Sequence, residues 1–242
     1  MKRLSVVIPV YNEEGTLEEI LDRVARAPLP SPLREIEMVV VDDCSQDGTW
    51  TALENWRPPT REEGGAVEIV RRRHSHNRGK GATLRSGFEV ATGEILLIQD
   101  ADLEYDPKDY STLLSPITSG LAEVVYGSRF LGGPHRVLFF WHFVGNTFLT
   151  LMSNIFSGLN LTDMETCYKV FTREVLDGIT LRSNRFGFEP EFTAKVSRLG
   201  VRIYEVPISY HGRTYEEGKK IGWKDGVSAV WSILRFNLWS RR

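Results

Sequence analysis

The sequence predicts an α/β fold in which a mostly parallel sheet carries helices on both faces. Short β-branched runs alternate with polar, helix-like segments over the first two thirds of the 242-residue chain. This βαβ alternation is typical of parallel sheets whose faces are covered by helices. Polar residues also concentrate where the predicted strands end, which is the edge at which open α/β sheets bind their ligands.

The predicted elements follow one another regularly along the chain. The expected strands are Leu4–Pro9, Met38–Val41, Val67–Val70 and Ile95–Ile98. The expected helices between them are Glu14–Ala27, Asp47–Asn55 and Lys80–Ala91. A loop rich in Pro and Gly fills residues 57–65 and separates the second helix from the third strand.

Composition excludes several classes of protein. Lys plus Arg total 30 against 32 for Asp plus Glu, a formal charge of −2, which argues against a protein that holds nucleic acid by bulk charge. The chain is 41% apolar and 26% charged, a globular rather than disordered composition. The two cysteines lie far apart and the start of the chain lacks the apolar stretch of a secretory signal. We therefore expect free thiols and a cytoplasmic location.

Two familiar nucleotide motifs are absent from the sequence. No G-x-G-x-x-G follows the first predicted strand, and no G-x-x-x-x-G-K-[ST] occurs anywhere. Gly79-Lys80-Gly81 comes closest, but it follows the third strand. These absences argue against a Rossmann dehydrogenase and a P-loop NTPase.

The acidic pair Asp100 and Asp102 directly follows the fourth predicted strand. Residues two apart in an extended chain face the same way. Two hard oxygen ligands on one side suit Mg²⁺ or Mn²⁺, with phosphate oxygens and water filling the remaining positions. A solvated acidic turn is the competing interpretation. The other polar strand ends, Tyr11 to Glu13 and Asp42-Asp43, favour the metal site.

Three segments carry a resemblance to a known family. They are VVIPVYNEE at 6–14, VDDCSQDGT at 41–49 and QDAD at 99–102. Together they resemble the signatures of family 2 glycosyltransferases of the GT-A fold. Within that family the chain is most similar to the dolichyl- and polyprenol-phosphate mannose or glucose synthases. The later segments that support this likeness are YGSRF at 126–130, TDMET at 162–166, FGFEPE at 186–191 and residues 213–221.

The resemblance implies a role for each motif. A GT-A domain would span residues 1–215 and a basic loop with an amphipathic helical tail residues 216–242. Mg²⁺ or Mn²⁺ would be held by Asp100 and Asp102 with help from Glu104. Arg213, Lys219 and Lys220 would approach the donor phosphates, and Arg129 and Arg136 are candidates for an acceptor phosphate. The nucleotide-sugar would contact Pro9, Tyr11, Glu13, Asp42, Lys80, Gln99 and Asp100.

Some positions depart from the family pattern. Cys44 stands where the family usually has Gly, and Met164-Glu165-Thr166 follows Asp163 where Pro-x-Ser is usual. Lys219-Lys220 replaces the usual Ser-Lys.

The implied reaction is a metal-dependent, inverting transfer of a hexose from GDP-mannose or a UDP-sugar to a polyprenyl phosphate. A phosphate monoester is already largely dianionic at neutral pH and needs no general base. A hydroxyl acceptor on a glycan or protein is the alternative and would need a carboxylate, with Asp163, Glu189 and Glu191 as candidates. The last two flank Pro190, so helix capping competes with catalysis as their role. A nucleotide-sugar binder without catalysis is the third hypothesis.

Two segments suggest a lipid surface. Residues 137–159 place apolar side chains at helical spacing, which fits a buried core helix as well as membrane contact. The segment 219–242 carries six basic residues and one acid together with Trp223, Trp231 and Trp239. A basic amphipathic helix with tryptophans indicates peripheral contact with an anionic membrane, here on its cytoplasmic face. A helix packed on the domain is the competing interpretation.

Overall fold

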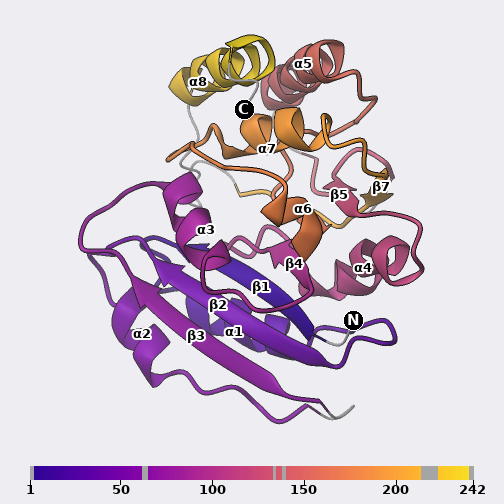
Figure 1. The fold of residues 1–242 in the computed structure, drawn as a ribbon. Coiled ribbons are helices and arrows are strands. Elements are labelled where there is room, and N and C mark those ends of the chain that lie inside the picture. Colours follow the sequence, from indigo (N-terminus) through magenta and orange to yellow (C-terminus); the bar gives the residue numbers. More distant parts are fainter. Residues whose placement is uncertain (1–2, 62–64, 133–134, 138–139, 214–222, 240–242) are drawn as a thin grey trace.

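A computed structural model of the chain describes residues 3–61, 65–132, 135–137, 140–213 and 223–239. Its strands form a seven-stranded sheet in the order β3-β2-β1-β4-β6-β5-β7 (Figure 1). Strand β6 runs antiparallel to both of its neighbours, and the other neighbouring strands pair in parallel. The strands are β1 Arg3–Val10, β2 Glu35–Asp42, β3 Val67–Arg73, β4 Ile95–Ile98, β5 Val124–Ser128, β6 Lys169–Thr172 and β7 Ile203–Pro207.

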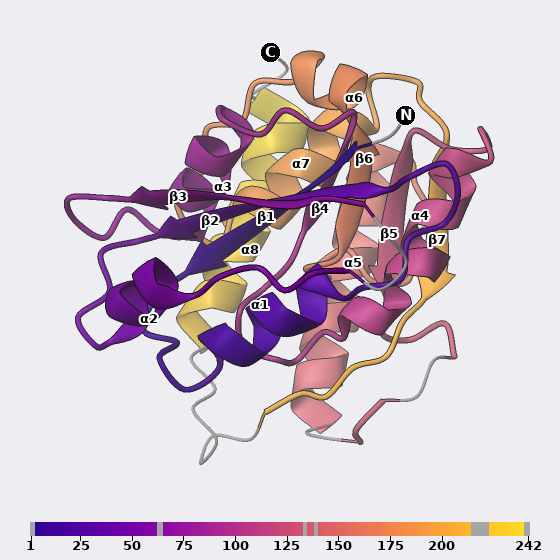
Figure 2. The same ribbon diagram turned by 90° about the horizontal axis from the view of Figure 1, so that it is seen from below.

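Helices cover both faces of this sheet, as predicted. Helices α1 and α2 lie on one face of the β1–β3 region and α3 lies on the other (Figure 2), the arrangement that right-handed crossovers produce. The helices of the first half are α1 Leu17–Ala25, α2 Thr49–Asn55, α3 Lys80–Phe88, the short 3₁₀ turn η1 Pro107–Asp109 and α4 Tyr110–Thr118. The later helices are α5 Phe140–Ser157, α6 Arg173–Asp177, α7 Phe188–Val196, α8 Trp223–Leu234 and the π-helical turn η2 Arg235–Trp239.

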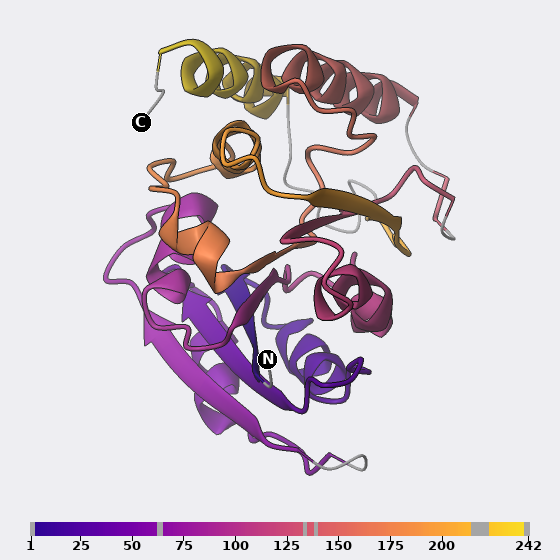
Figure 3. The same ribbon diagram turned by 45° about the vertical axis from the view of Figure 1, so that its right-hand side comes forward.

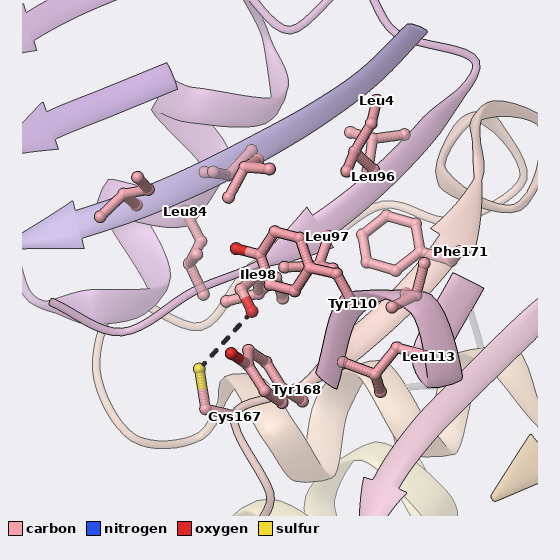
Figure 4. Close-up of a cluster of buried hydrophobic side chains, with 14 of the residues drawn as sticks. Leu4, Leu84, Leu96, Leu97, Ile98, Tyr110, Leu113, Cys167, Tyr168 and Phe171 are labelled. Atoms are coloured by element: carbon pink, nitrogen blue, oxygen red, sulfur yellow. Dashed lines mark hydrogen bonds between the residues drawn. The ribbon is translucent and has the colours of Figure 1, made fainter. Parts of the chain in front are cut away.

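Tight packing sets the position of α3 and of the loops around it. A Cβ atom on Gly87 would lie 2.4 Å from Cγ1 of Val7 in β1, so glycine lets α3 approach the sheet closely. Strand β4 pairs with β1 on the side opposite β2, and its side chains pack against α4. Figure 4 shows Leu97 and Ile98 of β4 gathered with Tyr110 of α4 and with Tyr168. All four side chains are almost completely buried.

A second layer of helices stands beside the sheet. Helices α5 and α8 lie side by side and pack against α7 (Figures 1 and 3). One face of the C-terminal helix is buried through Ile233 and, in η2, Phe236, while Trp231 and Trp239 remain exposed. The helix thus packs on the domain and still presents tryptophans to the outside. The predicted boundary at 215–216 lies outside the described residues.

None of the helices among the described residues combines the length and apolar character needed to cross a membrane.

Candidate functional site

Loops after three strands carry unusual backbone conformations. Within the described ranges, the non-glycine residues with positive φ are Asn12 (54°), Cys44 (64°) and Leu103 (63°), which follow β1, β2 and β4 in turn. Such conformations are costly for L-residues and cluster at functional sites. A glycine at position 44 would adopt this left-handed conformation with less strain.

Asp42 is held rigidly at the end of β2. Its buried carboxylate accepts hydrogen bonds from the backbone N–H of Ser45 at 3.1 Å and ion-pairs with Arg73 Nε at 3.0 Å. Asn12 bridges this loop to β1, because its N–H donates to Ser45 Oγ and its side-chain oxygen accepts from the N–H of Gln46. The loops that carry Tyr11 and Asp42 are therefore joined, and Tyr11 keeps 38% of its surface exposed beside them.

Two further predicted donor residues lie on the same strand and loop. Pro9 is half-buried in β1 opposite Val41, and the backbone N–H of Glu13 donates to Thr49 Oγ1 at 2.9 Å. These contacts fix the backbone of both residues beside the β1 and β2 loops.

Asp43 positions the turn that leads into α3, a role that sequence reasoning missed. Its carboxylate accepts from the backbone N–H groups of Arg78 at 2.9 Å and Gly79 at 2.7 Å. The same carboxylate contacts His74 Nδ1 at 2.6 Å. The histidine that follows β3 was the available signal. These bonds place the next residue, Lys80, at the carboxylates of the site.

Lys80 joins Asp100 to the start of α7. Its ammonium lies 2.9 Å from Asp100 Oδ1 and 3.3 Å from Glu189 Oε1. Burial alone would lower the pKa of Lys80, but the two carboxylates hold that pKa well above its usual value. Lys80 is therefore a permanent positive charge at the edge of the site.

Asp102 lies in the most negative part of the site. Arg213 Nη2 contacts its Oδ2 at 2.9 Å, and Nη1 of the same guanidinium lies 3.7 Å from Glu13 Oε2. Burial, together with Asp100 and Glu104, nevertheless raises the pKa of Asp102 to about 7. Negative charge thus exceeds what the nearby side chains balance, which is the environment that a cation would stabilise.

Gln99 is fully buried, and its side chain turns toward the core. Its Oε1 accepts from the hydroxyl groups of Tyr110 at 2.9 Å and Tyr168 at 2.8 Å. Its Nε2 donates to the carbonyl oxygens of Asp100 and Tyr105. In this structure the predicted nucleotide-sugar contact instead holds the loop that carries Asp100 and Asp102.

Glu104 is occupied by the segment after β7. Its Oε2 accepts from the hydroxyl of Tyr210 at 2.8 Å, and its Oε1 accepts from the backbone N–H of Arg213 at 2.9 Å. In the described parts of the chain, no three His, Cys, Asp or Glu side chains converge as metal ligands. Mg²⁺ bound with a diphosphate needs only one or two protein carboxylates. Asp100 and Asp102 together therefore fit such an ion, and Glu104 is not required as a direct ligand.

The predicted acceptor residues lie beside this segment. Arg129 grips Asp163 through two contacts, Nε to Oδ2 at 2.6 Å and Nη2 to Oδ1 at 2.7 Å. Its guanidinium also lies 5.1 Å from the ring centre of Tyr210. Arg136 Nη1 donates to the carbonyl oxygen of Gly212 at 3.3 Å. Arg129 and Arg136 thus both contact residues 210–213, the segment that also carries Arg213.

The candidate general bases have different surroundings. Glu191 is fully buried and accepts from the N–H groups of Arg182 and Ser183 and from Lys195 Nζ. These donors show that it holds the segment before α7. Glu189, in contrast, has a buried Oε2 atom with no hydrogen-bond partner among the residues that the structure describes. Lys219 and Lys220 lie outside the described residues.

Comparisons with known proteins identify the family. The sequence profile described as Glycosyl transferase family 2 matches residues 5–180. Undecaprenyl-phosphate mannosyltransferase of Micrococcus luteus is 32% identical over 252 residues, which cover 99% of this chain and 96% of that protein. The low-salt glycan biosynthesis hexosyltransferase Agl6 of Haloferax volcanii is 30% identical over 240 residues. That match covers 97% of this chain but spans only about half, 53%, of Agl6.

Solved structures share the architecture. Glucosyl-3-phosphoglycerate synthase from Mycobacterium tuberculosis, in complex with Mn²⁺, UDP and glucosyl-3-phosphoglycerate, aligns with a TM-score of 0.69 at 20% identity. The alignment covers 98% of this chain and 80% of that chain. This similarity confirms the predicted GT-A fold. Together with the family profile and the curated relatives, it establishes that the chain belongs to glycosyl transferase family 2 and is a glycosyltransferase.

Proposed function

We propose that this protein transfers a hexose from a nucleotide-sugar to a polyprenyl phosphate, with inversion at the anomeric carbon. The observation that carries the proposal is the contact of both subsites with residues 210–213. Arg213 reaches Asp102 on the donor side, while Arg129 and Arg136 contact the same segment at Tyr210 and Gly212. Two phosphate-bearing substrates would then meet where cationic side chains already lie close together.

The state of the candidate bases supports a phosphate acceptor. Asp163 is engaged by Arg129 and Glu191 by two backbone N–H groups, so neither carboxylate is available to take a proton from a hydroxyl. A dianionic phosphate attacks without a base. Transfer to a hydroxyl is the second candidate function, because one oxygen of Glu189 has no hydrogen-bond partner among the residues that the structure describes.

On the donor side, Asp100 and Asp102 would hold Mg²⁺ or Mn²⁺ on the diphosphate, and Glu104 would support the segment that carries Arg213. The ion would supply charge stabilisation of the leaving nucleoside diphosphate. Lys80 holds Asp100 in place, and Arg213 is close enough to the site to add positive charge as negative charge develops. The loops of Tyr11 and Asp42, with Pro9 and Glu13, form the side proposed for the nucleoside.

A lipid-linked acceptor also fits the outer helix layer. Helix α5 contains no Asp, Glu, Lys or Arg over its 18 residues. Several of its large apolar side chains are exposed, as are others on α8 and η2: Phe140, Trp141, Phe148, Leu151, Ile155, Val227, Trp231, Leu238 and Trp239. We call this set the α5–α8 face. We propose that the face rests in the interfacial region of a membrane, on its cytoplasmic side.

A product assay tests the proposal. Purified protein is incubated with a panel of GDP- and UDP-sugars and a short polyprenyl phosphate, with Mn²⁺ or with EDTA, and lipid products are detected by mass spectrometry. We expect one donor to give a metal-dependent glycosylated lipid phosphate. Donor hydrolysis without any lipid product would contradict the assignment of a polyprenyl phosphate as the acceptor. Absence of any donor turnover would favour a nucleotide-sugar binder without catalysis.

A further inference from the structure

Tyr210 contacts the donor side of the site through its hydroxyl group. The hydroxyl donates to Glu104 Oε2 at 2.8 Å. The other oxygen of Glu104 accepts from the backbone N–H of Arg213 at 2.9 Å, and Arg213 Nη2 contacts Asp102 at 2.9 Å. A short chain of polar contacts therefore runs from the Tyr210 hydroxyl to Asp102.

The ring of the same residue contacts the acceptor side. The Arg129 guanidinium carbon lies 5.1 Å from the centre of the ring, within the range of a cation–π interaction. The ring of Tyr105 packs 5.4 Å away, and the Tyr210 carbonyl oxygen accepts from the N–H of Arg136 at 3.0 Å. These contacts fix the ring against the side chain that is the first candidate for the acceptor phosphate.

We propose that Tyr210 is a positioning residue that couples the two subsites, its hydroxyl ordering Glu104 and Arg213 for the donor and its ring ordering Arg129 for the acceptor phosphate. This inference rests on the proposed function, since it assigns Arg129 to the acceptor. It goes beyond that function by naming one side chain that contacts both subsites, so that the positions of the donor residues and of Arg129 depend on the same residue.

The two halves of Tyr210 make the proposal separable by substitution. Tyr210→Phe keeps the ring and removes the hydroxyl, whereas Tyr210→Leu removes both. A hydrogen bond to a charged group contributes about 1.5–3 kcal/mol, which corresponds to a tenfold or greater effect. A cation–π contact contributes less, about fivefold in affinity. Both variants should therefore weaken the donor side, and Tyr210→Leu should weaken the acceptor side more than Tyr210→Phe does.

The first readout is Mn²⁺ binding in the presence of GDP or UDP, measured by electron paramagnetic resonance of free Mn²⁺. We expect both variants to bind Mn²⁺ about tenfold more weakly than the wild type, because both lose the bond to Glu104. The second readout is the KM for farnesyl phosphate at saturating donor. The Tyr210 hydroxyl also has a hydrogen-bonding interaction with Arg129. We therefore expect this KM to rise about twofold in Tyr210→Phe and about fivefold in Tyr210→Leu, which loses the ring as well.

Tyr204→Phe is the matched control, because Tyr204 lies on β7 with 42% of its surface exposed. Thermal unfolding of each variant checks that the fold is retained. Wild-type Mn²⁺ binding in Tyr210→Phe, or identical acceptor KM values in the two variants, would overturn the inference. If the wild type itself transfers no sugar to farnesyl phosphate, the proposed function fails, and the Mn²⁺ readout still decides whether Tyr210 supports the donor side.

Discussion

At the scale of single residues, buried charge is unevenly balanced. Glu165 and Lys169 illustrate this. Lys169 is fully buried and donates to the carbonyl oxygens of Met164 and Thr166, while Glu165 has an Oε1 atom with no partner among the described residues. Burial, followed by the charge of Glu189, raises the pKa of Glu165 to about 8, although Lys169 and Arg129 oppose the shift.

The raised pKa of Glu165 predicts a pH-dependent effect on stability. An acid with a pKa raised from 4.5 to about 8 in the folded state binds its proton more tightly when folded. The folded state is therefore destabilised as the pH rises. This loss of stability is absent below about pH 4, grows between about pH 4 and pH 8, and is complete above about pH 8. We expect Glu165→Gln to stabilise the protein by more than about 1 kcal/mol at pH 9 relative to its effect at pH 5. Chemical denaturation at both pH values, with exposed Glu174→Gln as the control, measures this; equal effects at the two pH values would contradict it.

Cys44 gives a second prediction at this scale. Because its φ is 64°, a glycine should adopt this backbone with less strain, whereas a β-branched side chain should add strain. We expect Cys44→Gly to change the free energy of unfolding by less than about 1 kcal/mol and Cys44→Val to lower it by more than about 1 kcal/mol. Urea denaturation compares them, and a valine variant as stable as the glycine variant would refute the role of backbone strain.

At the scale of secondary-structure elements, the sequence predicted some parts and not others. The four strands of the first half were predicted, because each is a short apolar run between polar segments and the four pair with one another in parallel. Strand β6 was not predicted, since its place between β4 and β5 depends on contacts across the whole chain. Predicted helices were longer than observed: the first was expected over 14–27, whereas α1 spans Leu17–Ala25.

The same limit applies to the site. The carboxylates Asp100 and Asp102 were predicted because they directly follow a buried strand. The role of Gln99 could not be read from its position in the motif, because it depends on tyrosines from α4 and from the segment before β6. The roles of Asp43 and Tyr210 were missed for a similar reason, since their partners lie 31 to 106 positions away in sequence.

Helix α7 provides a direct comparison of two neighbouring carboxylates. Glu191 accepts hydrogen bonds from backbone N–H groups and from Lys195. Glu189 contacts Lys80, and its other oxygen has no partner within the described ranges. Neutralising Glu191 leaves the buried Lys195 without its ion-pair partner, so we expect Glu191→Gln to lower the free energy of unfolding by about 3 kcal/mol. Glu189→Gln should lower it by less than about 1 kcal/mol. Equal losses in the two variants, measured by urea denaturation, would show that Glu191 does not have the structural role described above.

The α5–α8 face predicts lipid binding at the scale of its helices. Phe148 and Ile155 are 56% and 69% exposed, and embedding such side chains contributes on the order of 1–2 kcal/mol each. We expect Phe148→Ser combined with Ile155→Ser to weaken sedimentation with anionic vesicles by at least about tenfold. Leu199→Ser is the control, because Leu199 is 37% exposed and lies outside the face. An equal loss in the control, or no loss in the double variant, would contradict membrane contact through α5.

At the scale of the whole molecule, the fold arranges its layers in an order that suits a lipid-linked substrate. We propose that the nucleotide binds at the ends of β1, β2 and β4. Helices α5 and α8, which carry the α5–α8 face, lie on the far side of α7 from β1–β3 (Figure 3). The arginines Arg129, Arg136 and Arg213 lie where residues 210–213 meet the loops after β4 and β5. We therefore propose that the phosphate of the acceptor, and not a hydroxyl group, is the nucleophile.

The most direct test of that central claim compares two acceptors that differ only in the phosphate. Sugar transfer is measured with a polyprenyl phosphate and with the corresponding free polyprenol, using the donor found in the panel and Mn²⁺. We expect transfer to the phosphate and none to the alcohol, and we expect Asp102→Asn to abolish the reaction and Glu189→Gln to retain it. Transfer to the alcohol, or loss of all activity in Glu189→Gln with the fold intact, would contradict it and favour base-assisted transfer to a hydroxyl.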